Sequence, residues 1–323
     1  MNIKTVNPIA AFMVGAQEQA HALQNAVPGA GASSDENYRW LHFDLNDPGL
    51  ADWLNEHLPP SAAGALLQSE TRPRCDTVDQ GIILNLRGVN LNPGADPEDM
   101  VSLRLWVTGN LIVSVTRRKV WALEDLRAKL ENGVAPPNVG AFLFELANSL
   151  TRRIEEVSLD LEEQADNLEE QMIDNPAGLS ADLAPVRMQV IKLRRFVRPQ
   201  REALVELATV RTELIGKVNR SQMREISNRA ARTVEELDTT RDRLALIQEH
   251  VDALNTAAFG KNGYILSLVA AIFLPLGFLS GIFGVNVGGM PGLESPYAFL
   301  ILSIVCVAIA AILFAIFRWT KWL

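Results

Sequence analysis

Two long apolar runs in the last quarter of the chain dominate its pattern of hydrophobic and polar positions. Residues 264–283 supply twenty mostly apolar positions, and residues 297–317 form a second uncharged run of similar length. A helix of about 20 residues, rising 1.5 Å per residue, spans the roughly 30 Å hydrocarbon core of a bilayer. Both runs lie too far from the N-terminus to be a cleaved signal peptide. The pattern therefore predicts an integral membrane protein with a two-helix transmembrane hairpin, rather than two buried core helices of a soluble domain.

Charges beside the two runs predict their orientation. Lys261 precedes the first run, Arg318 and Lys321 follow the second, and the connecting loop 284–296 carries only Glu294. Because positive residues stay on the cytoplasmic side, both termini are expected in the cytoplasm and the loop is expected to face outward. Residues 318–323 then form a cytoplasmic basic tail.

Short strand-like runs before residue 138 predict a small cytoplasmic α/β domain. Residues 1–34 are rich in Ala, Gly and Gln and are expected to form a mobile tail, so the domain is expected to cover residues 35–138. A hairpin is predicted where the fourth strand follows the third across Thr108, Gly109 and Asn110. The expected strands cover residues 40–45, 81–86, 102–107 and 111–115, and the expected helices cover residues 50–57 and 122–130.

Residues 139–218 read as a pair of helices of opposite charge. Nine acids fall in residues 151–180, while nine basic residues against four acids fall in residues 181–220, with a turn at residues 175–178 between the two segments. We expect the acidic helix to fold back on the basic one, with complementary charge fixing the pairing. The alternative is two solvated faces whose charges are not paired.

A long stalk helix is predicted over residues 219–283, running without interruption into the first apolar run. One heptad stripe is apolar and has Thr233 and Thr240 as polar gaps. At 1.5 Å per residue the helix would be about 95 Å long. The stripe consists of Met223, Ile226, Ala230, Leu237, Leu244, Ile247, Val251, Leu254 and Ala258.

Small residues share one face of the first predicted span, and their simplest role is close packing between helices. They are Gly263, Ala270, Gly277, Gly281 and Gly284. Two spans cannot enclose a hydrophilic path, so a conducting protein would need several copies around an axis. Asn286 would then contribute to a ring of amides at the outer mouth, unless it only caps the first span.

Little in the composition suggests catalysis. The chain has two cysteines, of which Cys75 precedes the spans and Cys306 lies within one, and its four histidines are isolated. We therefore expect neither a disulfide framework nor a high-affinity zinc cage. No Walker loop, dinucleotide fingerprint or nucleophile elbow is present, so no enzyme activity and no cofactor are expected. The formal net charge of −8 argues against nucleic acid and suits a partner that is a cation.

The loop between the spans resembles the signature of a known family. Gly284-Val285-Asn286 followed by Met290-Pro291 is similar to the G-M-N and M-P-E motifs of the CorA-type divalent-cation transporters, and R195-F-V-R-P-Q-R-E202 adds to the likeness. This resemblance implies a funnel-shaped homopentamer with a cytoplasmic α+β domain, a helical stalk and a central pore. It also implies a selectivity filter at Gly284, Val285 and Asn286. The residues expected to line the pore are Gly263, Leu266, Ala270, Leu274, Gly277 and Gly281.

Two departures from the motif point to one branch of that family. Val285 and Gly292 stand where magnesium members carry Met and Glu, and the loop is similar to that of the ZntB-like zinc transporters. The resemblance implies zinc uptake across a bacterial inner membrane, coupled to protons, with export as the alternative direction and with cadmium, nickel and cobalt as further ions. Glu294 is a candidate replacement for the missing loop acid. A magnesium or cobalt channel of the same fold and a membrane-anchored coiled-coil scaffold remain as alternatives.

Acids recur every seven residues on the stalk face opposite the apolar stripe. They are Glu235, Asp242 and Glu249. In a fivefold assembly each would form a ring of carboxylates that concentrates hydrated cations at the cytoplasmic mouth of the pore. Glu249 lies nearest the membrane and, with Asn286, is the expected metal contact. The alternative is a solvated helix face whose acids share a register by chance.

Overall fold

The computed structural model describes residues 6–15, 19–23, 38–78, 80–174, 179–210, 215–285 and 295–320. Contacts divide the chain into two compact units, Met1–Gln248 and Glu249–Leu323. The first unit contains a sheet with the helices that cover it. The second contains the apolar C-terminal helices, and the long helix α6 contributes to both units.

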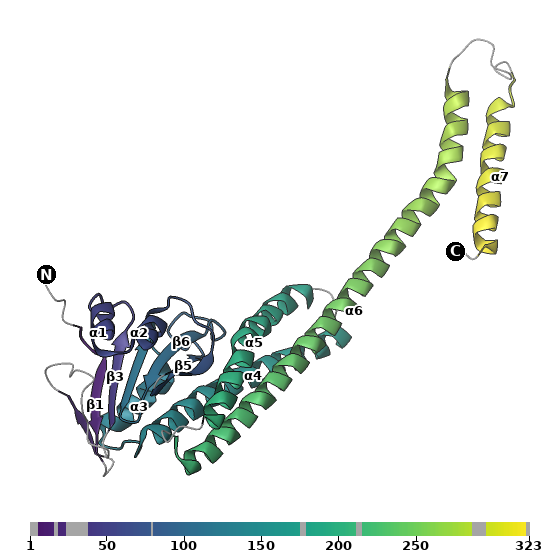
Figure 1. Cartoon of the computed structure of the whole chain (residues 1–323). Helices are drawn as coiled ribbons and strands as arrows, with labels where there is room; N and C mark the ends of the chain where they lie inside the picture. Colours follow the sequence, from purple (N-terminus) through teal and green to yellow (C-terminus); the bar gives the residue numbers. More distant parts are fainter. Residues whose placement is uncertain are drawn as a thin grey trace. The chain divides into compact units, whose positions relative to one another are not determined.

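A seven-stranded sheet, in the order β2-β1-β3-β7-β6-β5-β4, forms the centre of the first unit (Figure 1). Neighbouring strands are antiparallel except β3 and β7, which are parallel. The predicted hairpin is confirmed, because β6 pairs antiparallel with β7 across Thr108–Asn110. The strands are β1 Ala10–Val14, β2 Ala20–Ala22, β3 Tyr38–Asp44, β4 Arg74–Val78, β5 Gly81–Gly88, β6 Val101–Val107 and β7 Leu111–Thr116.

Apolar side chains are buried on both faces of this sheet. Trp40 of β3 belongs to a core with helices α3 (Trp121–Glu131) and α4 (Val139–Asp174). Its neighbour Leu41 belongs to a second core with α1 (Leu50–His57) and α2 (Pro60–Leu67). Successive side chains of a strand point to opposite faces, so a sheet covered on both sides needs nearly continuous apolar strands. This explains why β3, β5 and β7 read as apolar runs rather than as alternating ones.

Part of the expected mobile tail is ordered in the sheet, which corrects that expectation. Residues 10–14 form β1, which pairs antiparallel with β3, and β2 pairs with β1. Ala10, Phe12 and Val14 are buried while the residues between them are half-buried. The average composition of residues 1–34 concealed this five-residue alternation. Residues 1–5, 16–18 and 24–37 lie outside the described part of the chain.

Three long helices follow the sheet. They are α4, α5 (Leu179–Thr209) and α6 (Lys217–Gly284), of which α6 alone has 68 residues. The apolar stripe of α6 is buried from Met223 to Val251, whereas Leu254 is 40% exposed and Ala258 is exposed. Thr233 and Thr240, the two polar gaps, are also buried. Their hydroxyls donate hydrogen bonds to carbonyl oxygens one turn earlier on α6, as buried threonines on helices commonly do.

Helices α4 and α5 pack against each other, but charge does not pair them as we expected. Among the described residues, no ion pair links α4 to α5; each helix instead forms ion pairs with α6. Acidic α4 contacts two arginines of α6, and basic α5 contacts one acid of α6. The expectation failed because it compared the charges of consecutive helices and left the third out.

The contacts of α4 with α6 are made by Arg229 and Arg243. Arg229 donates hydrogen bonds to both carboxylate oxygens of Glu155 and, over 2.7 Å, to the side-chain oxygen of Asn148. Arg243 donates from Nε and Nη2 to the two oxygens of Glu169, over 2.7 and 2.8 Å, and contacts Asp166 as well. Such two-point contacts between a guanidinium and a carboxylate are stronger and more directional than single ones. The hydrogen bond from Arg243 lowers the pKa of Glu169 below its ordinary value.

Helix α5 is also held to α6 by an ion pair, which Arg194 of α5 forms. It contacts the carboxylate of Asp238 on α6, and Arg198 lies 3.8 Å from the same group. Asp238 is five residues before Arg243, so α4 and α5 hold neighbouring turns of α6. Ion pairs and the buried stripe together fix the rotation of α6 within the first unit.

Replacing Arg243 by Gln should therefore loosen α6. The side chain of Arg243 is 26% exposed and bridges two carboxylates, so we expect a loss of roughly 1 kcal/mol. Thermal unfolding of the full-length protein in detergent should shift down by about 2–4 °C. Arg241→Gln is the matched control, because Arg241 pairs only with its neighbour Asp242 in the described structure. An equal shift in both variants would contradict the role given to Arg243.

The stabilising effect of Arg243 should also depend on pH. Because the folded-state pKa of Glu169 is lowered, this contribution is fully present above the ordinary glutamate pKa of 4.5 and disappears as pH falls through the lower folded-state value. The difference in unfolding temperature between the natural protein and Arg243→Gln should be largest near neutral pH and small in strong acid. A difference that grows on acidification would contradict this assignment.

Candidate functional site

Two helices of the second unit are long and apolar enough to cross a membrane. One is the C-terminal part of α6 and the other is α7 (Ala298–Trp319). Their most apolar 18-residue stretches have mean hydropathies of 2.3 and 3.2, and no residue of either stretch is buried. The sequence predicted the first stretch to cover Tyr264 to Phe283, and these residues lie within α6.

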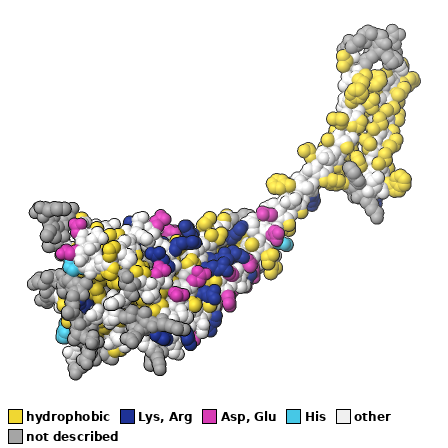
Figure 2. Space-filling view, in the orientation of Figure 1, with side chains coloured by type: hydrophobic (Ala, Val, Ile, Leu, Met, Phe, Trp, Pro, Cys, Tyr) yellow, Lys and Arg dark blue, Asp and Glu magenta, His cyan; other side chains and the backbone are white. Residues whose placement is uncertain are grey.

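Large apolar side chains cover the outside of these two helices, as Figure 2 shows. Those more than 65% exposed include Leu266, Phe273, Leu274, Phe278 and Phe299. An apolar surface of this extent is costly in water and needs lipid or another protein surface to cover it. The predicted pore-lining residues Leu266 and Leu274, at 71% and 77% exposed, belong to this uncovered surface.

The small-residue face of α6 is uncovered as well. At Gly263, Gly277, Gly281 and Gly284, no atom of the described structure other than adjacent residues and the nearby backbone of α6 itself lies within 4 Å of the place where a Cβ would be. Ala270, on the same face, is also exposed. Packing within a single described chain therefore does not explain why these positions are small. They would permit close approach of a further helix.

The expected filter is described only in part. Gly284 is the last residue of α6, and Val285 follows it with 54% of its surface exposed. Asn286, Glu294 and the Met290-Pro291 pair lie in residues 286–294, outside the described residues. Their assigned roles stay predictions.

The predicted acidic face of α6 is exposed throughout. Glu235, Asp242 and Glu249 are each exposed, while Leu237 and Leu244, two positions after the first two acids, are buried. Two residues correspond to about 200° around a helix, so the acids point away from the buried stripe. Asp242 accepts a hydrogen bond from its neighbour Arg241 over 2.9 Å, which partly offsets its charge. Their arrangement as rings stays a prediction, because it depends on other copies.

Within the ranges that the structure describes, no three His, Cys, Asp or Glu side chains lie close enough together to hold a metal ion. His42 is buried between strands, where its Nδ1 lies 3.0 Å from Ser114 Oγ, and burial lowers its pKa to about 4. It is a neutral core residue. His57 stacks on Trp53 and is likewise held by its own helix.

Sequence reasoning missed a cavity of about 740 Å³ in the first unit that is lined by arginines. One signal was present in the sequence. Arg104 interrupts the otherwise apolar strand of residues 102–107, where a charged residue is costly unless it serves a purpose. The other arginines come from loops and from α5, and their convergence depends on the fold.

Comparison with known proteins identifies the family. A family model described as CorA-like Mg²⁺ transporter protein matches residues 35–319. A zinc transport protein ZntB of Pectobacterium carotovorum is 35% identical over 286 residues, which cover 88% of each chain. A divalent cation transporter CmaX of Pseudomonas aeruginosa is 33% identical over 294 residues, which cover 89% of this chain and 88% of that one.

Solved structures agree with this assignment. The full-length CmaX protein superposes with a TM-score of 0.82 at 30% identity and covers all of both chains. The CorA magnesium transporter of Methanocaldococcus jannaschii gives a TM-score of 0.75 at 17% identity over 98% of this chain and 100% of that one, which shows a shared fold.

The family match confirms the family resemblance drawn from the sequence, and with the two uncovered apolar helices it makes the chain a membrane protein. An α/β body, a long helix and two apolar C-terminal helices are the shared architecture. By a family match over most of its length and by relatives above 30% identity, this chain belongs to the CorA-like Mg²⁺ transporter protein family.

Proposed function

We propose that this protein transports divalent cations across a membrane and that zinc is its principal ion. One observation carries the choice of zinc: relatives named zinc transport protein ZntB align over 88% of the chain. The loop agrees with it, because Val285 and Gly292 depart from the magnesium motif. A bacterial inner membrane with both termini in the cytoplasm is the proposed setting. The positive residues Lys261, Arg318 and Lys321 support that orientation.

Several copies, five by the family resemblance, are proposed to surround a common axis. The uncovered small-residue face of α6 supports this, because a single described chain leaves it without any neighbour. In the assembly this face and Leu266 and Leu274 line the pore, and α7 lies outside against lipid. Asn286 supplies carboxamide oxygens to the cation at the outer mouth, beside Gly284 and Val285. Oxygen ligands of this kind exchange a hydrated cation without trapping it.

Uptake is proposed to follow a proton gradient. No charged side chain occurs from Asn262 to Leu293, so no carboxylate within the first span can carry the proton. The carboxylates available to α6 are those of its cytoplasmic part. Proton movement would therefore use water in the pore together with groups such as Glu249.

Magnesium or cobalt transport in the same fold is the second candidate. The description of the family model and the similarity to a magnesium transporter favour it. Zinc flux into proteoliposomes, measured with an imposed pH gradient and with excess magnesium, separates the two. We expect zinc entry that rises with an inward proton gradient and that magnesium inhibits weakly. Magnesium flux with no zinc flux would select the second candidate, and no flux of either ion would favour a membrane-anchored scaffold.

Asn286→Ala should abolish zinc entry while leaving the oligomer assembled. The substitution removes the amide oxygens from the proposed filter and little else. Zinc flux in proteoliposomes and the size of the detergent-solubilised protein are the measurements. Asn55→Ala, at an exposed position of α1, is the control. Flux at the natural rate in Asn286→Ala would remove this residue from the mechanism.

Neutralising the acidic face tests the cytoplasmic rings. We expect Glu235→Gln, Asp242→Asn and Glu249→Gln together to slow zinc flux roughly two- to tenfold at low ionic strength, and less when salt screens the charges. Glu56→Gln, Glu163→Gln and Glu170→Gln remove the same charge from other exposed positions and should have little effect. Equal slowing in both triple variants would mean that only the net charge matters.

Gly281→Leu should prevent normal assembly. A branched side chain on the small-residue face holds neighbouring helices apart, so we expect a changed oligomer size or lost conduction. Ala271→Leu places the same leucine side chain roughly 80° around the helix and is the control. Native mass spectrometry gives the size of the assembly. Unchanged size and unchanged flux in Gly281→Leu would show that this face contacts lipid.

A further inference from the structure

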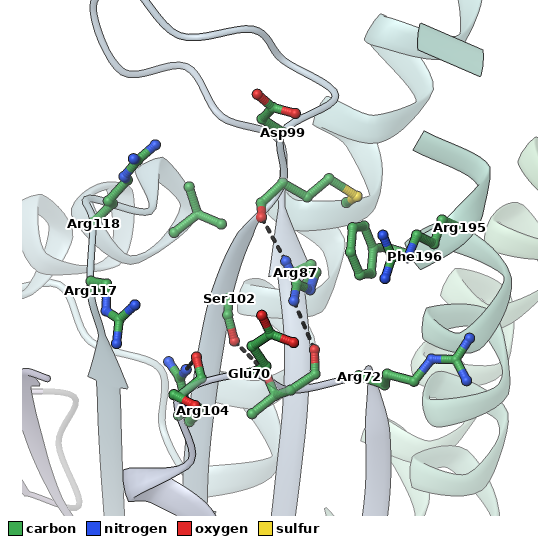
Figure 3. Close-up of a pocket in the computed structure, with 14 residues that line it drawn as sticks. Glu70, Arg72, Arg87, Asp99, Ser102, Arg104, Arg117, Arg118, Arg195 and Phe196 are labelled. Atoms are coloured by element: carbon green, nitrogen blue, oxygen red, sulfur yellow. Dashed lines mark hydrogen bonds between the residues drawn. The ribbon is translucent and has the colours of Figure 1, made fainter. Parts of the chain in front are cut away.

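The arginine-lined cavity lies beside the sheet, where four parts of the first unit meet. Strands β5 and β6 supply its floor, the segment after β7 supplies one wall, and α5 supplies the opposite wall, as Figure 3 shows. Residues 69–72, which precede β4, complete the lining. Its volume of about 740 Å³ is in the range of natural small-molecule pockets. Six of its lining residues are arginines: Arg72, Arg87, Arg104, Arg117, Arg118 and Arg195.

Positive charge in this cavity is not balanced by the residues around it. Glu70 and Asp99 are the two acids of the lining, so a surplus of four positive charges remains. Asp99 accepts a hydrogen bond over 3.0 Å from Lys192. The negative charge of Asp99 is therefore already shared with a lysine and neutralises less of the positive charge of the arginines. The surplus stands out because the whole chain carries a formal charge of −8.

Two arginines of the floor are satisfied by neutral groups. Arg104 is 2% exposed, and it donates hydrogen bonds to the carbonyl oxygens of Gln68 and Ser69 over 3.0 and 3.2 Å. Arg87 donates to the carbonyl oxygens of Met100 and Thr71 over 2.8 and 2.7 Å. Carbonyl groups fix the orientation of a guanidinium, but they carry no charge to neutralise it. Glu70 is the one acid of the lining whose charge acts on Arg87.

Some donors of the floor are also left unused. Within the described structure, Nη1 of buried Arg104 and Nε of Arg87 have no hydrogen-bond partner. A buried donor without a partner costs on the order of 1–3 kcal/mol, and more when it is charged. Burial, with repulsion from Arg117 and Arg87, lowers the pKa of Arg104 to about 10. The floor is therefore destabilised by its own charge, and an anion in the cavity would relieve this.

The walls add exposed arginines that are free to meet a ligand. Arg117 and Arg118 follow β7, and Arg195 lies across the cavity on α5 beside Phe196. None of these three arginines forms an ion pair with another described residue. The Phe196 ring lies between the floor and this wall. The guanidinium carbon of Arg87 is 3.8 Å from the ring centre, and that of Arg195 is 5.3 Å from it. Arg195 and Phe196 open the R195–E202 motif, which the transport mechanism does not use.

We propose that this cavity binds a soluble small molecule that carries two or more phosphate groups. All six cations of the lining are arginines, whose planar forks match phosphate oxygens two at a time. Arginines on opposite walls, above a floor with unused donors, suit an extended polyanion better than a single small anion. The concave shape and the volume suit a small molecule rather than a flat protein surface.

The test measures calorimetric binding of metal-free inorganic pyrophosphate and triphosphate to the full-length protein in nanodiscs of neutral lipid. We expect saturable binding that is tighter than for inorganic phosphate and that weakens with salt. Arg117→Gln with Arg118→Gln changes only exposed wall residues, so the fold should persist. This variant should bind at least roughly tenfold more weakly, because two charged contacts are lost.

Arg201→Gln with Arg224→Gln is the matched control, since both residues are exposed and lie outside the cavity. It should bind like the natural protein. No binding by the natural protein, or equal loss in both double variants, would overturn the proposal. Loss of pyrophosphate binding in nanodiscs of phosphatidylglycerol would assign the cavity to lipid headgroups and would also overturn it. Because binding is measured without transport, these outcomes are independent of whether the protein carries zinc.

Discussion

Attachment of α6 to α4 and α5 along one side is the constraint on which the rest of the structure depends. Burying a large aliphatic side chain stabilises a fold by about 1.5–3 kcal/mol, and the stripe from Met223 to Val251 contains several. Arg229 and Arg243 then fix the rotation of the helix by forming directional contacts with acids of α4. Once this side is chosen, the acids at 235 and 242 must face away from α4 and α5.

The uncovered surfaces of α6 have different chemistry along its length. The part that precedes the apolar run exposes carboxylates, and the apolar part exposes large hydrophobic side chains together with a glycine face. For a single chain in water, exposing the apolar part of α6 would be unfavourable. Lipid on the hydrophobic side and copies of the same helix on the glycine side would cover both, which is the arrangement that the proposed transport requires.

Local patterns predicted much of the fold. Helix α1 begins and ends where the sequence indicated, and the β6–β7 hairpin follows from its turn residues between two apolar strands. Strands β1, β2 and β4 and helix α2 were missed because they are short, at three to eight residues each, and their residues are less uniformly apolar than those of the central strands. The ion pairs of α4 and α5 were misassigned for a related reason, since their partner is a third helix.

The candidate sites also differ in how far the sequence could predict them. Periodicity alone brought out the acidic and small-residue faces of α6, because a continuous helix converts sequence spacing directly into direction. Periodicity could not reveal the arginine cavity, because its residues come from strands, loops and α5 and converge only in the folded chain. Arg104 within an apolar strand was its one local sign.

Cross-linking between copies at residue 249 tests the central claim, that the uncovered acidic face of α6 points to a shared axis. Glu249→Cys would be introduced into full-length protein in which Cys306 is replaced by Ala, and treated in the membrane with a short thiol cross-linker. Leu254→Cys, about 140° around the same helix, is the reference. The account predicts a ladder of cross-linked oligomers for position 249 and much less for position 254. Monomer alone at 249, or stronger linking at 254, would contradict it.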